Sequence, residues 1–407
     1  MECRFCGNNL TYEFIDLVNS PPSNSFLSKD QLNEPEVFYP LKLFVCDKCF
    51  LVQIDEYKKS NEIFNSDYVY FSSFSQSWLE HSKNYVIMII DRLGLDGSSL
   101  VAEIASNDGY LLQYFKQNGI QCYGIEPSIN TALVAKQKGI DVVEKFFDSY
   151  LATNLANEGK RVDLLLGNNV LAHVPNINDF VRGLKKLIKD KGTITMEFPH
   201  ILNLIEQNQF DTIYHEHFSY FSFYAVNKIF KTHGLKIYDV EELPTHGGSL
   251  RIYATHEESE VLTLDSVKSM FIKEEKFGIT KIATYSSFSE KVDKIKNNLL
   301  EFLISAKKEG KKVVGYGAAA KGNTLLNYCG IKKDLISFVA DRSPYKQGKF
   351  LPGSHIPVEN EEFFKAEMPD YVLILPWNIK NELIKQLSYI GGWSGKFITA
   401  IPYLEIL

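Results

Sequence analysis

The feature that most restricts the fold is a series of short apolar segments over residues 99–199, each followed by a helical stretch. These segments are "LVAEI" from Leu100, "QCYGI" from Gln121, "VDLLLGN" from Val162 and "GTITMEFP" from Gly192. Strands that alternate with helices along a chain pair in parallel. The pattern therefore predicts a doubly wound α/β domain. A second strand–glycine–helix unit, "KKVVGYGAAAKGN" from Lys311, predicts another α/β unit near the C-terminus.

Length and composition narrow the class of protein. A chain of 407 residues is long for a single core, so two or three domains are expected. Its net charge of −6 argues against a nucleic-acid partner, because proteins that bind polyanions usually carry a basic excess. No apolar run reaches the roughly 18 residues that a membrane span needs, and no signal-peptide pattern opens the chain. We therefore expect no membrane partner and a cytoplasmic location.

The cysteines predict a metal site. Cys3 and Cys6 form one C-x-x-C pair, and Cys46 and Cys49 form a second. Two such pairs supply the four thiolates that hold Zn²⁺ tetrahedrally, and "LKLFVCDKCFLVQI" reads as a hairpin around the second pair. Two separate redox pairs are the alternative. Because the chain is acidic, a structural zinc ribbon is favoured over a nucleic-acid-binding one.

The turn after the first strand of the α/β domain predicts a nucleoside cofactor. Small residues let the backbone approach a ligand at the carboxyl end of a strand, and an acid that ends the next strand can accept both ribose hydroxyls. The turn lacks G-x-G-x-x-G, and its acids and amides suit the ammonium group of a methionine, which favours S-adenosylmethionine over NAD. The predicted cofactor residues are Glu103, Ala105, Ser106, Asn107, Asp108, Gly109, Glu126, Pro127 and Asn168.

Two histidine-containing stretches allow several interpretations. "NNVLAHV" places His173 in an apolar segment, where a histidine is often a hydrogen-bonded core residue. "YHEH" spans residues 214–217, and in a strand His215 and His217 would share a face and could bind a metal. The H-E-x-x-H spacing of zinc proteases is absent. Acid/base groups, metal ligands and core residues all remain open on the local sequence alone.

Several motifs together resemble one enzyme family over nearly the whole chain. They are the two C-x-x-C pairs, "YVYFSSFSQSW", "EIASNDGYLL", "GIEPS", "NNVLAHV", "YHEHFSYFS", "HGGSLRIY" and "GYGAAAKGNTLLN". The chain resembles the C-methyltransferases of deoxysugar biosynthesis, which methylate carbon 3 of a nucleotide-linked 4-keto sugar. The resemblance implies a zinc-binding domain over residues 1–57 and a class I Rossmann-like methyltransferase domain with an N-terminal lid over 58–257. A helical connector and a C-terminal Rossmann-like domain would fill 258–407.

The resemblance also implies roles for the histidines. A general base removes the proton alpha to the ketone, and histidine has a suitable pKa for this step. By resemblance His217 is that base, and His173 and Tyr214 position the sugar and stabilise the enolate. Glu216 would orient a neighbour or contact the sugar, and Tyr70 would reach the site from the lid. The implied substrate-binding residues are Asn169, His200, His246, Lys321, Asn323 and Arg342.

The C-terminal glycine-rich turn predicts an anion site. Gly315 and Gly317 precede a helix that carries Lys321 in its first turns, and helix N-termini bind anions. The resemblance implies that this domain helps to hold the diphosphate of a dTDP- or GDP-linked sugar; a turn that only packs is the alternative. The family more often has an arginine at the position of His355. A monomer and a dimer are equally expected.

Three other functions are compatible with the same sequence. An epimerase or isomerase would use the enolate without methyl transfer. An O- or N-methyltransferase would act on the sugar without an acidic carbon. A zinc-ribbon binding module with an inactive cofactor fold would not be an enzyme at all.

Overall fold

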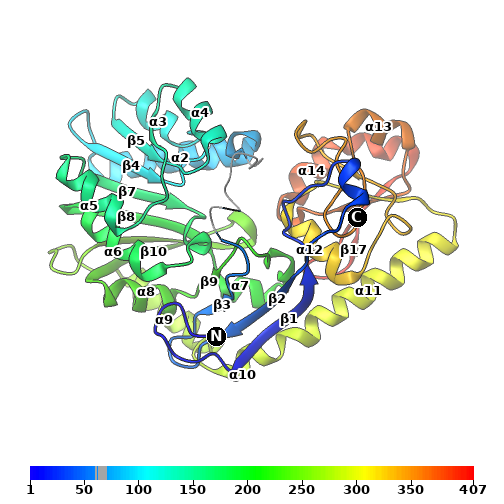
Figure 1. Cartoon of the computed structure of the whole chain (residues 1–407), viewed down its shortest axis with the longest axis horizontal. Helices are drawn as coiled ribbons and strands as arrows, with labels where there is room; N and C mark the ends of the chain where they lie inside the picture. The colour runs from blue at the N-terminus through cyan, green and yellow to red at the C-terminus, as the bar shows by residue number, and fades with distance from the viewer. Residues whose placement is uncertain (60–61, 63–70) are drawn as a thin grey trace.

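The computed structural model describes residues 1–59, 62 and 71–407. Three sheets make up the molecule: one in a lobe formed by the middle of the chain, one in a C-terminal lobe, and one between them (Figure 1). Tyr70, the predicted lid tyrosine, lies outside the described residues. Among the residues that are described, no helix has both the length and the apolar character to cross a bilayer.

The middle lobe is built on a seven-stranded sheet of order β10-β11-β8-β7-β4-β5-β6. The strands are β4 (Leu100–Ile104), β5 (Gln121–Ile125), β6 (Asp141–Val143), β7 (Val162–Asn168), β8 (Ile188–Pro199), β10 (Leu235–Leu243) and β11 (Ser249–His256). Strands β4 to β8 pair in parallel, as predicted for β4, β5, β7 and β8; the short β6 was not predicted. Apart from β6 and the first residues of β5 and β8, these strands are mostly buried because helices cover the sheet. Strands β10 and β11 add an antiparallel hairpin that the sequence pattern did not predict.

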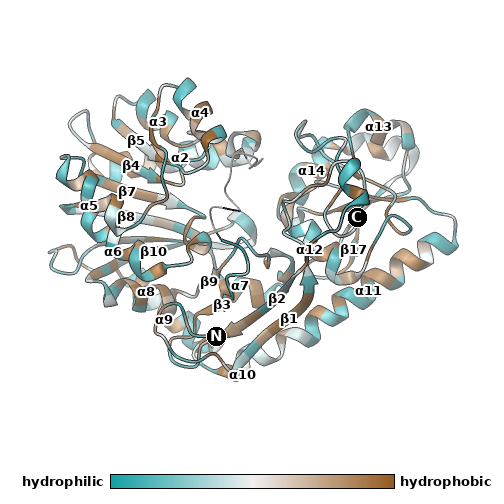
Figure 2. Ribbon diagram, viewed as in Figure 1, coloured by the Kyte–Doolittle hydropathy of each residue, from teal (hydrophilic) through white to brown (hydrophobic). Residues whose placement is uncertain are grey.

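Helices cover both sides of this sheet. They are α2 (Gln76–Leu93), α3 (Leu112–Gln117), α4 (Ile129–Gln137), α5 (Ser149–Asn157), α6 (Ile177–Leu187), α8 (Phe223–Thr232) and α9 (Asp265–Phe277). Helix α7 (Ile201–Glu206) instead packs in a core that it shares with the N-terminal segment. Helix α6 shows why they form: Asn176 caps its first turn, and its apolar residues recur at helical spacing and face the core. Figure 2 shows the same division, with hydrophobic residues concentrated in the strands and mixed character on the outer helices.

Short 3₁₀ turns carry several residues of interest at the ends of the strands. In the middle lobe they are η2 (Ser72–Phe74), η3 (Leu171–His173), η4 (Phe210–Thr212) and η5 (Thr245–Gly247). Turns η3 and η5 pack against β8, and η2 is hydrogen-bonded to Asn107 after β4; the carboxyl ends of strands are where ligands bind in open α/β sheets. These turns therefore form the wall on which an active site can be built.

The N-terminal segment forms a four-stranded sheet of order β1-β2-β3-β9. Its strands are β1 (Tyr12–Ser20), β2 (Tyr39–Val45), β3 (Val52–Ile54) and β9 (Ser219–Tyr220), and η1 (Asp30–Asn33) lies in the connection between β1 and β2. Strands β2 and β3 form the predicted hairpin around the second cysteine pair. Strand β9 comes from the middle of the chain and pairs with β3 through Val52–Tyr220 and Gln53–Ser219. The sheet thus joins two distant parts of the sequence.

The C-terminal lobe is a second Rossmann-like unit, as predicted. Its six-stranded sheet has the order β14-β13-β12-β15-β16-β17, and all pairs except β16–β17 are parallel. The strands are β12 (Val313–Tyr316), β13 (Val339–Ala340), β14 (Val358–Glu359), β15 (Tyr371–Ile374), β16 (Lys396–Thr399) and β17 (Glu405–Ile406). The helical elements are α12 (Ala320–Cys329), α13 (Glu361–Glu367), η6 (Trp377–Ile379), α14 (Lys380–Gln386) and η7 (Ser388–Trp393).

Two helices connect the lobes along the lower edge of the molecule in Figure 1. They are α10 (Ile282–Ser286) and the long α11 (Phe288–Lys308). Phe288 stacks on Phe14 of β1, with 4.8 Å between ring centroids, so the connector packs on the N-terminal sheet. That sheet is therefore a bridge between the two Rossmann-like lobes.

The loop between β1 and β2 contacts the C-terminal lobe directly. The Asn323 side-chain amide donates to the Ser23 carbonyl at 2.5 Å. Glu36 accepts a hydrogen bond from the Gly353 amide at 2.8 Å and pairs with His355 Nε2 at 2.9 Å. His355, which stands where the family more often has an arginine, is therefore part of this contact.

Candidate active site

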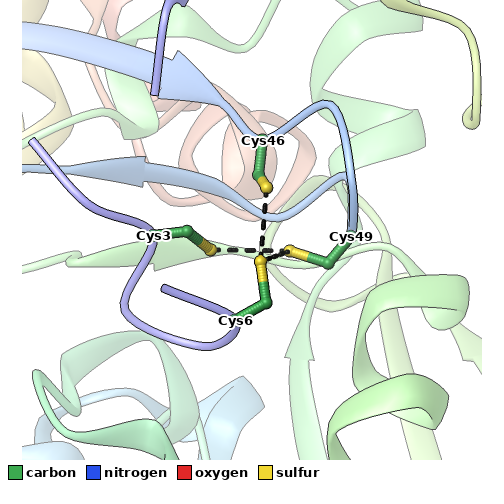
Figure 3. Close-up of side chains that lie close together, drawn as sticks. All are labelled: Cys3, Cys6, Cys46 and Cys49. Atoms are coloured by element: carbon green, nitrogen blue, oxygen red, sulfur yellow. Dashed lines mark hydrogen bonds between the residues drawn. The ribbon is translucent and has the colours of Figure 1, made fainter. Parts of the chain in front are cut away.

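The four cysteine thiols converge at one point of the N-terminal sheet (Figure 3). Cys3 Sγ lies 3.5 Å from Cys49 Sγ, and Cys6 Sγ lies 3.5 Å from Cys46 Sγ. Tetrahedral Zn–S bonds of about 2.3 Å place sulfurs about 3.8 Å apart, so the cluster has the size of a Zn(Cys)₄ site. Among the described residues no other group of three or more possible ligands converges in this way. His215 and His217 are thus not part of a metal cluster.

The turn after β4 forms a cradle lined with acids. Ala105, Asn107 and Gly109 have positive φ angles, which bend the chain back over the end of the strand. A Cβ on Gly109 would lie 2.4 Å from Ile140 Cδ1, so only glycine fits there. Both oxygens of Glu126, which follows β5, accept backbone hydrogen bonds, one of them from Asn107 N at 2.9 Å. The turn after β4 and the acid after β5, both predicted to bind the cofactor, are therefore hydrogen-bonded to each other.

The charges in this cradle favour a cationic ligand. Glu103 is fully buried, and burial raises its pKa well above the usual range, with a further contribution from the negative charges of Asp108 and Glu126. Asp108 Oδ1 is buried and has no hydrogen-bond partner in the described part of the chain. Orphaned polar atoms of this kind mark a place for a polar ligand. A methionine ammonium, which only donates, matches the vacant acceptor Asp108 Oδ1 and the negative charges of the cradle.

Other predicted cofactor residues have structural roles. Ser106 packs against Gly124, where an added Cβ would lie 2.2 Å from Ser106 Oγ. Pro127 follows Glu126 directly and is partly buried at the rim of the cradle. The amide of Ser72 donates to Asn107 Oδ1 at 2.9 Å, so η2 is attached to the turn. These residues shape the cradle and attach the segment that precedes α2.

Two histidines face each other beyond the end of β7, and the acceptors of their hydrogen bonds determine the tautomer of each. His173 Nδ1 lies 2.7 Å from the Glu216 carbonyl oxygen, and His217 Nδ1 lies 3.0 Å from the Thr212 carbonyl oxygen. A carbonyl only accepts, so each Nδ1 carries a hydrogen and each neutral ring has an unprotonated Nε2. The two rings are 4.8 Å apart, and the Tyr214 ring is 4.1 Å from that of His217.

The surroundings keep these imidazoles neutral. Burial lowers the pKa of His217 well below its usual value, and the positive charge of Lys321 lowers it further. Burial also lowers the pKa of His173 to about 4. A neutral imidazole with an unprotonated Nε2 is the form that can act as a general base.

Glu216 and His215 point toward the N-terminal sheet and its loop. Residues 213–218 form a turn between η4 and β9 rather than a strand, so the alternation expected for "YHEH" does not apply. Glu216 Oε1 accepts a hydrogen bond from Asn24 Nδ2 at 2.7 Å, and burial raises the pKa of Glu216 to about 7. His215 Nε2 lies 3.2 Å from the Pro40 carbonyl oxygen and packs against Tyr39. His215 thus anchors the turn to β2.

A buried ion-pair network that we did not predict lies beside the site. Glu197, at the end of β8, bonds to His81 Nε2 at 2.9 Å, Arg251 Nη2 at 2.8 Å and Thr245 Oγ1 at 2.8 Å. Burial alone would raise the pKa of Glu197, but the His81 hydrogen bond and the Arg251 charge lower it to about 2. A lone acid and a lone arginine, each inside an apolar strand, are the sequence features that could have predicted this pairing.

The loop at η5 brings His246 to the same site. Its Nε2 accepts from Asn169 Nδ2 at 3.0 Å, and its ring contacts Trp78 edge-on at 5.1 Å. Burial and the Lys321 charge lower the pKa of His246 to about 4. Trp78 also stacks on His81 at 5.0 Å, so the first turns of α2 join the cofactor side of the site to the histidine side.

The remaining predicted substrate residues are distributed over different environments. His200 is buried, its Nε2 bonds to Glu274 Oε1 at 2.7 Å, and it lines the same small cavity as His217. Asn323 holds the Ser23 carbonyl, as described above. Lys321 is buried, bonds to Asn378 Oδ1 at 2.8 Å and lies over the Trp377 ring at 5.0 Å. Arg342 is exposed at the end of β13.

The C-terminal glycine-rich turn is occupied by the protein's own groups. The amide of Ala318 donates to Asp341 Oδ2 at 2.7 Å, and a Cβ on Gly317 would lie 2.5 Å from Pro376 Cδ. The carboxylate of Asp341 takes the position at which an anion would meet this turn. The turn therefore serves packing, and its amides are a poor match for the diphosphate site that the pattern suggested.

Three family models match successive parts of the chain. A putative zinc binding domain matches residues 3–64, a methyltransferase domain matches 78–240, and a C-methyltransferase C-terminal domain matches 244–402. Together with the acid-lined cradle and the four-cysteine cluster, these matches define an S-adenosylmethionine-dependent methyltransferase with a structural zinc site.

A curated relative identifies the family. The chain is 32% identical over 406 residues to C-methyltransferase NovU from Streptomyces niveus, an alignment that covers 100% of this chain and 96% of that protein. The chain belongs to this C-methyltransferase family, as the motifs predicted.

Solved methyltransferases resemble only part of the molecule. The magnesium protoporphyrin IX methyltransferase (ChlM) of Synechocystis PCC 6803, solved with bound SAM, is 16% identical with a TM-score of 0.36; the match covers 50% of this chain and all of that one. CcbJ methyltransferase from Streptomyces caelestis is 11% identical with a TM-score of 0.34, over 43% of this chain and 89% of that one. The family assignment does not depend on these low scores.

Proposed function

We propose that this C-methyltransferase acts on C3 of a nucleotide-linked 4-keto-deoxysugar, with His217 as the general base. One observation supports this assignment above all: the Thr212 carbonyl holds the Nδ1 hydrogen of a buried, neutral His217, so that Nε2 is available as a proton acceptor. S-adenosylmethionine would supply an electrophilic methyl group to the carbanion carbon.

In this proposal His217 Nε2 takes the proton from C3, and the C–H electron pair moves into the enolate. The bond from Thr212 stabilises the imidazolium that forms, because its carbonyl continues to accept from Nδ1. His173 also carries its hydrogen on Nδ1, which bonds to Glu216. Its Nε2 can then only accept, so His173 is suited to hold a sugar hydroxyl rather than the enolate oxygen.

The enolate oxygen at C4 needs donors. The Tyr214 hydroxyl and the Lys321 ammonium are the candidates, because Tyr214 packs on the His217 ring and the charge of Lys321 acts on His217 and His246. Donors in a buried site stabilise developing charge more strongly than donors in water do. Asn169, with His246, would contact the sugar ring. Arg342, the exposed cation beside the C-terminal sheet, is the candidate for the diphosphate.

The test replaces His217 by Asn. We expect loss of both methyl transfer and solvent deuterium exchange at C3 of the 4-keto sugar nucleotide, with S-adenosylmethionine affinity unchanged by calorimetry. His233→Asn is the matched control, because His233 lies at the end of α8 and bonds to Asn178. Near-normal turnover of His217→Asn would overturn the assignment of the base.

The same assays separate the other functions. Turnover of the sugar without S-adenosylmethionine would identify an epimerase or isomerase. A methyl group on oxygen or nitrogen in the product, detected by ¹³C NMR with labelled cofactor, would identify an O- or N-methyltransferase. A lack of any affinity for nucleotide sugars would point to a binding module.

A further inference from the structure

The C-terminal lobe binds the segment that determines the tautomer of His217. Trp377 Nε1 donates to Asp211 Oδ2 at 2.8 Å, and Thr324 Oγ1 donates to the Ile213 carbonyl at 2.8 Å. Both donors come from the C-terminal lobe, and both acceptors lie in the middle lobe. The residue between the two acceptors is Thr212, whose carbonyl bonds to His217 Nδ1.

These contacts are shielded from solvent. Asp211 and Ile213 are fully buried, Thr324 is 1% exposed and Trp377 is 8% exposed. Water does not compete effectively for hydrogen bonds at such positions, so loss of one donor leaves a buried acceptor unsatisfied. The Thr212 hydroxyl donates to the carbonyl of Gln209, the residue before η4, and this bond also helps to fix Thr212 in place.

The Trp377 ring has a second contact with the active-site wall. A Cβ on Gly247 would lie 2.5 Å from Trp377 Cη2, which means that the indole packs directly on the backbone of η5. The preceding residue of η5 is His246. One indole therefore touches the segment that orients His217 and the loop that carries His246.

We propose that Trp377 and Thr324 are positioning residues, through which docking of the C-terminal lobe sets the orientation of the catalytic base. The inference rests on the proposed function, since it takes His217 as that base. It assigns the C-terminal lobe a role in the proton-transfer step in addition to any role in substrate binding. A shift of about 1 Å in a catalytic group can lower a rate about 100-fold, so such support has a measurable effect.

The test uses Trp377→Phe and Thr324→Val, each of which removes one donor and keeps most of the side-chain volume. We expect kcat and the rate of C3 deuterium exchange to fall about 10- to 100-fold, with KM for the sugar nucleotide and affinity for S-adenosylmethionine within about threefold of wild type. Thr324→Ser retains the hydroxyl and should restore most of the rate. Trp393→Phe is the matched control, since Trp393 Nε1 bonds to Pro369 within the C-terminal lobe.

The outcomes separate this inference from the function on which it rests. If His217→Asn is inactive while Trp377→Phe and Thr324→Val exchange C3 at the wild-type rate, the positioning role is overturned and the base assignment stands. If His217→Asn is active, the proposed function fails on its own account. Should Trp377→Phe fail to fold, the Val and Ser variants of Thr324 decide: equal rates for the two would overturn the inference.

Discussion

At the scale of single residues, hydrogen-bond acceptors distinguish the histidines from one another. The carbonyls of Glu216 and Thr212 fix the hydrogen on Nδ1 of His173 and His217, whereas the carboxylate of Glu274 takes the Nε2 hydrogen of His200. Nε2 of the first two rings is left without a hydrogen, as the proposed function requires, and Nε2 of the third is held by a carboxylate. The hydrogen-bond partner, not the residue type, therefore sets which histidines can accept a proton.

The pH profile of kcat/KM tests the environment of the base. The base must be neutral, and the pKa of His217 lies well below 6.5 because of burial and the charge of neighbouring Lys321. We therefore expect the acid limb caused by His217 to lie well below pH 6.5, with full activity above it. Measurement between pH 4.5 and 8.5 checks this expectation.

Glu216 must be separated from His217 in that profile, because burial raises the pKa of Glu216 to about 7. A limb near pH 7 that disappears in Glu216→Gln would belong to the carboxyl group. A limb at or above pH 6.5 that persists in Glu216→Gln and in Asp211→Asn would contradict the lowered pKa of His217.

The sequence predicted the types of residue at the site better than their partners. The four cysteines and the turn from Glu103 to Gly109 followed from spacing, because metal geometry and close backbone approach both demand particular residues at fixed positions. Trp377 and Asp211 could not be predicted, since their hydrogen bond joins residues 166 apart and neither has a local pattern. His200 lines the same cavity as His217, but its bond to Glu274 could not be predicted because Glu274 lies in a distant helix.

At the scale of elements, the tight η5 loop leaves little space for an added side chain. Gly247 has φ +88°, and an added Cβ would lie 2.5 Å from Trp377 Cη2 and 2.7 Å from Gln209 Nε2. We expect Gly247→Ala to destabilise the protein by about 1–3 kcal/mol through backbone strain and to separate η5 from the C-terminal lobe. A lower thermal midpoint together with reduced methyl transfer would confirm the expectation.

Gly391→Ala provides the control for that change. It lies in η7, has nothing within 4 Å of an added Cβ and does not have a positive φ angle. An unchanged thermal midpoint in Gly247→Ala would mean that the loop can shift to accept the methyl group.

Long elements were predictable, and short ones were not. Strands β4, β5, β7 and β8 have continuous apolar runs, so their existence and parallel pairing follow from the sequence. Strand β9 has two residues, too few for any periodicity, and it forms only because β3 offers a free edge. The β10–β11 hairpin, over residues 235–256, was not predicted.

At the scale of the whole molecule, the four-cysteine site lies in the same sheet as β9, the strand that follows the turn with His217. Binding of structural zinc contributes directly to folding, so removing it should loosen β1 to β3 and, through β9, the turn that carries His217. We expect Cys46→Ser to lose zinc and at least about tenfold in methyl-transfer rate, while S-adenosylmethionine affinity stays within about twofold. Metal analysis, kinetics and calorimetry measure the three quantities.

Cys122→Ala is the control for the zinc variant, because Cys122 lies in β5 and is not part of the cluster. Full activity of zinc-free protein would show that the turn with His217 is independent of the N-terminal sheet.

The shared sheet has a consequence for recombination between relatives. Strand β9 lies inside the methyltransferase part of the sequence but pairs with β3 of the zinc-binding part. A chimaera with a crossover near residue 57 would combine β3 from one relative with β9 from another. The turn that precedes β9 would then adjoin a strand pair whose two sequences come from different proteins. Residues 210–222 should therefore be exchanged together with the zinc-binding part, although they are far from it in the sequence.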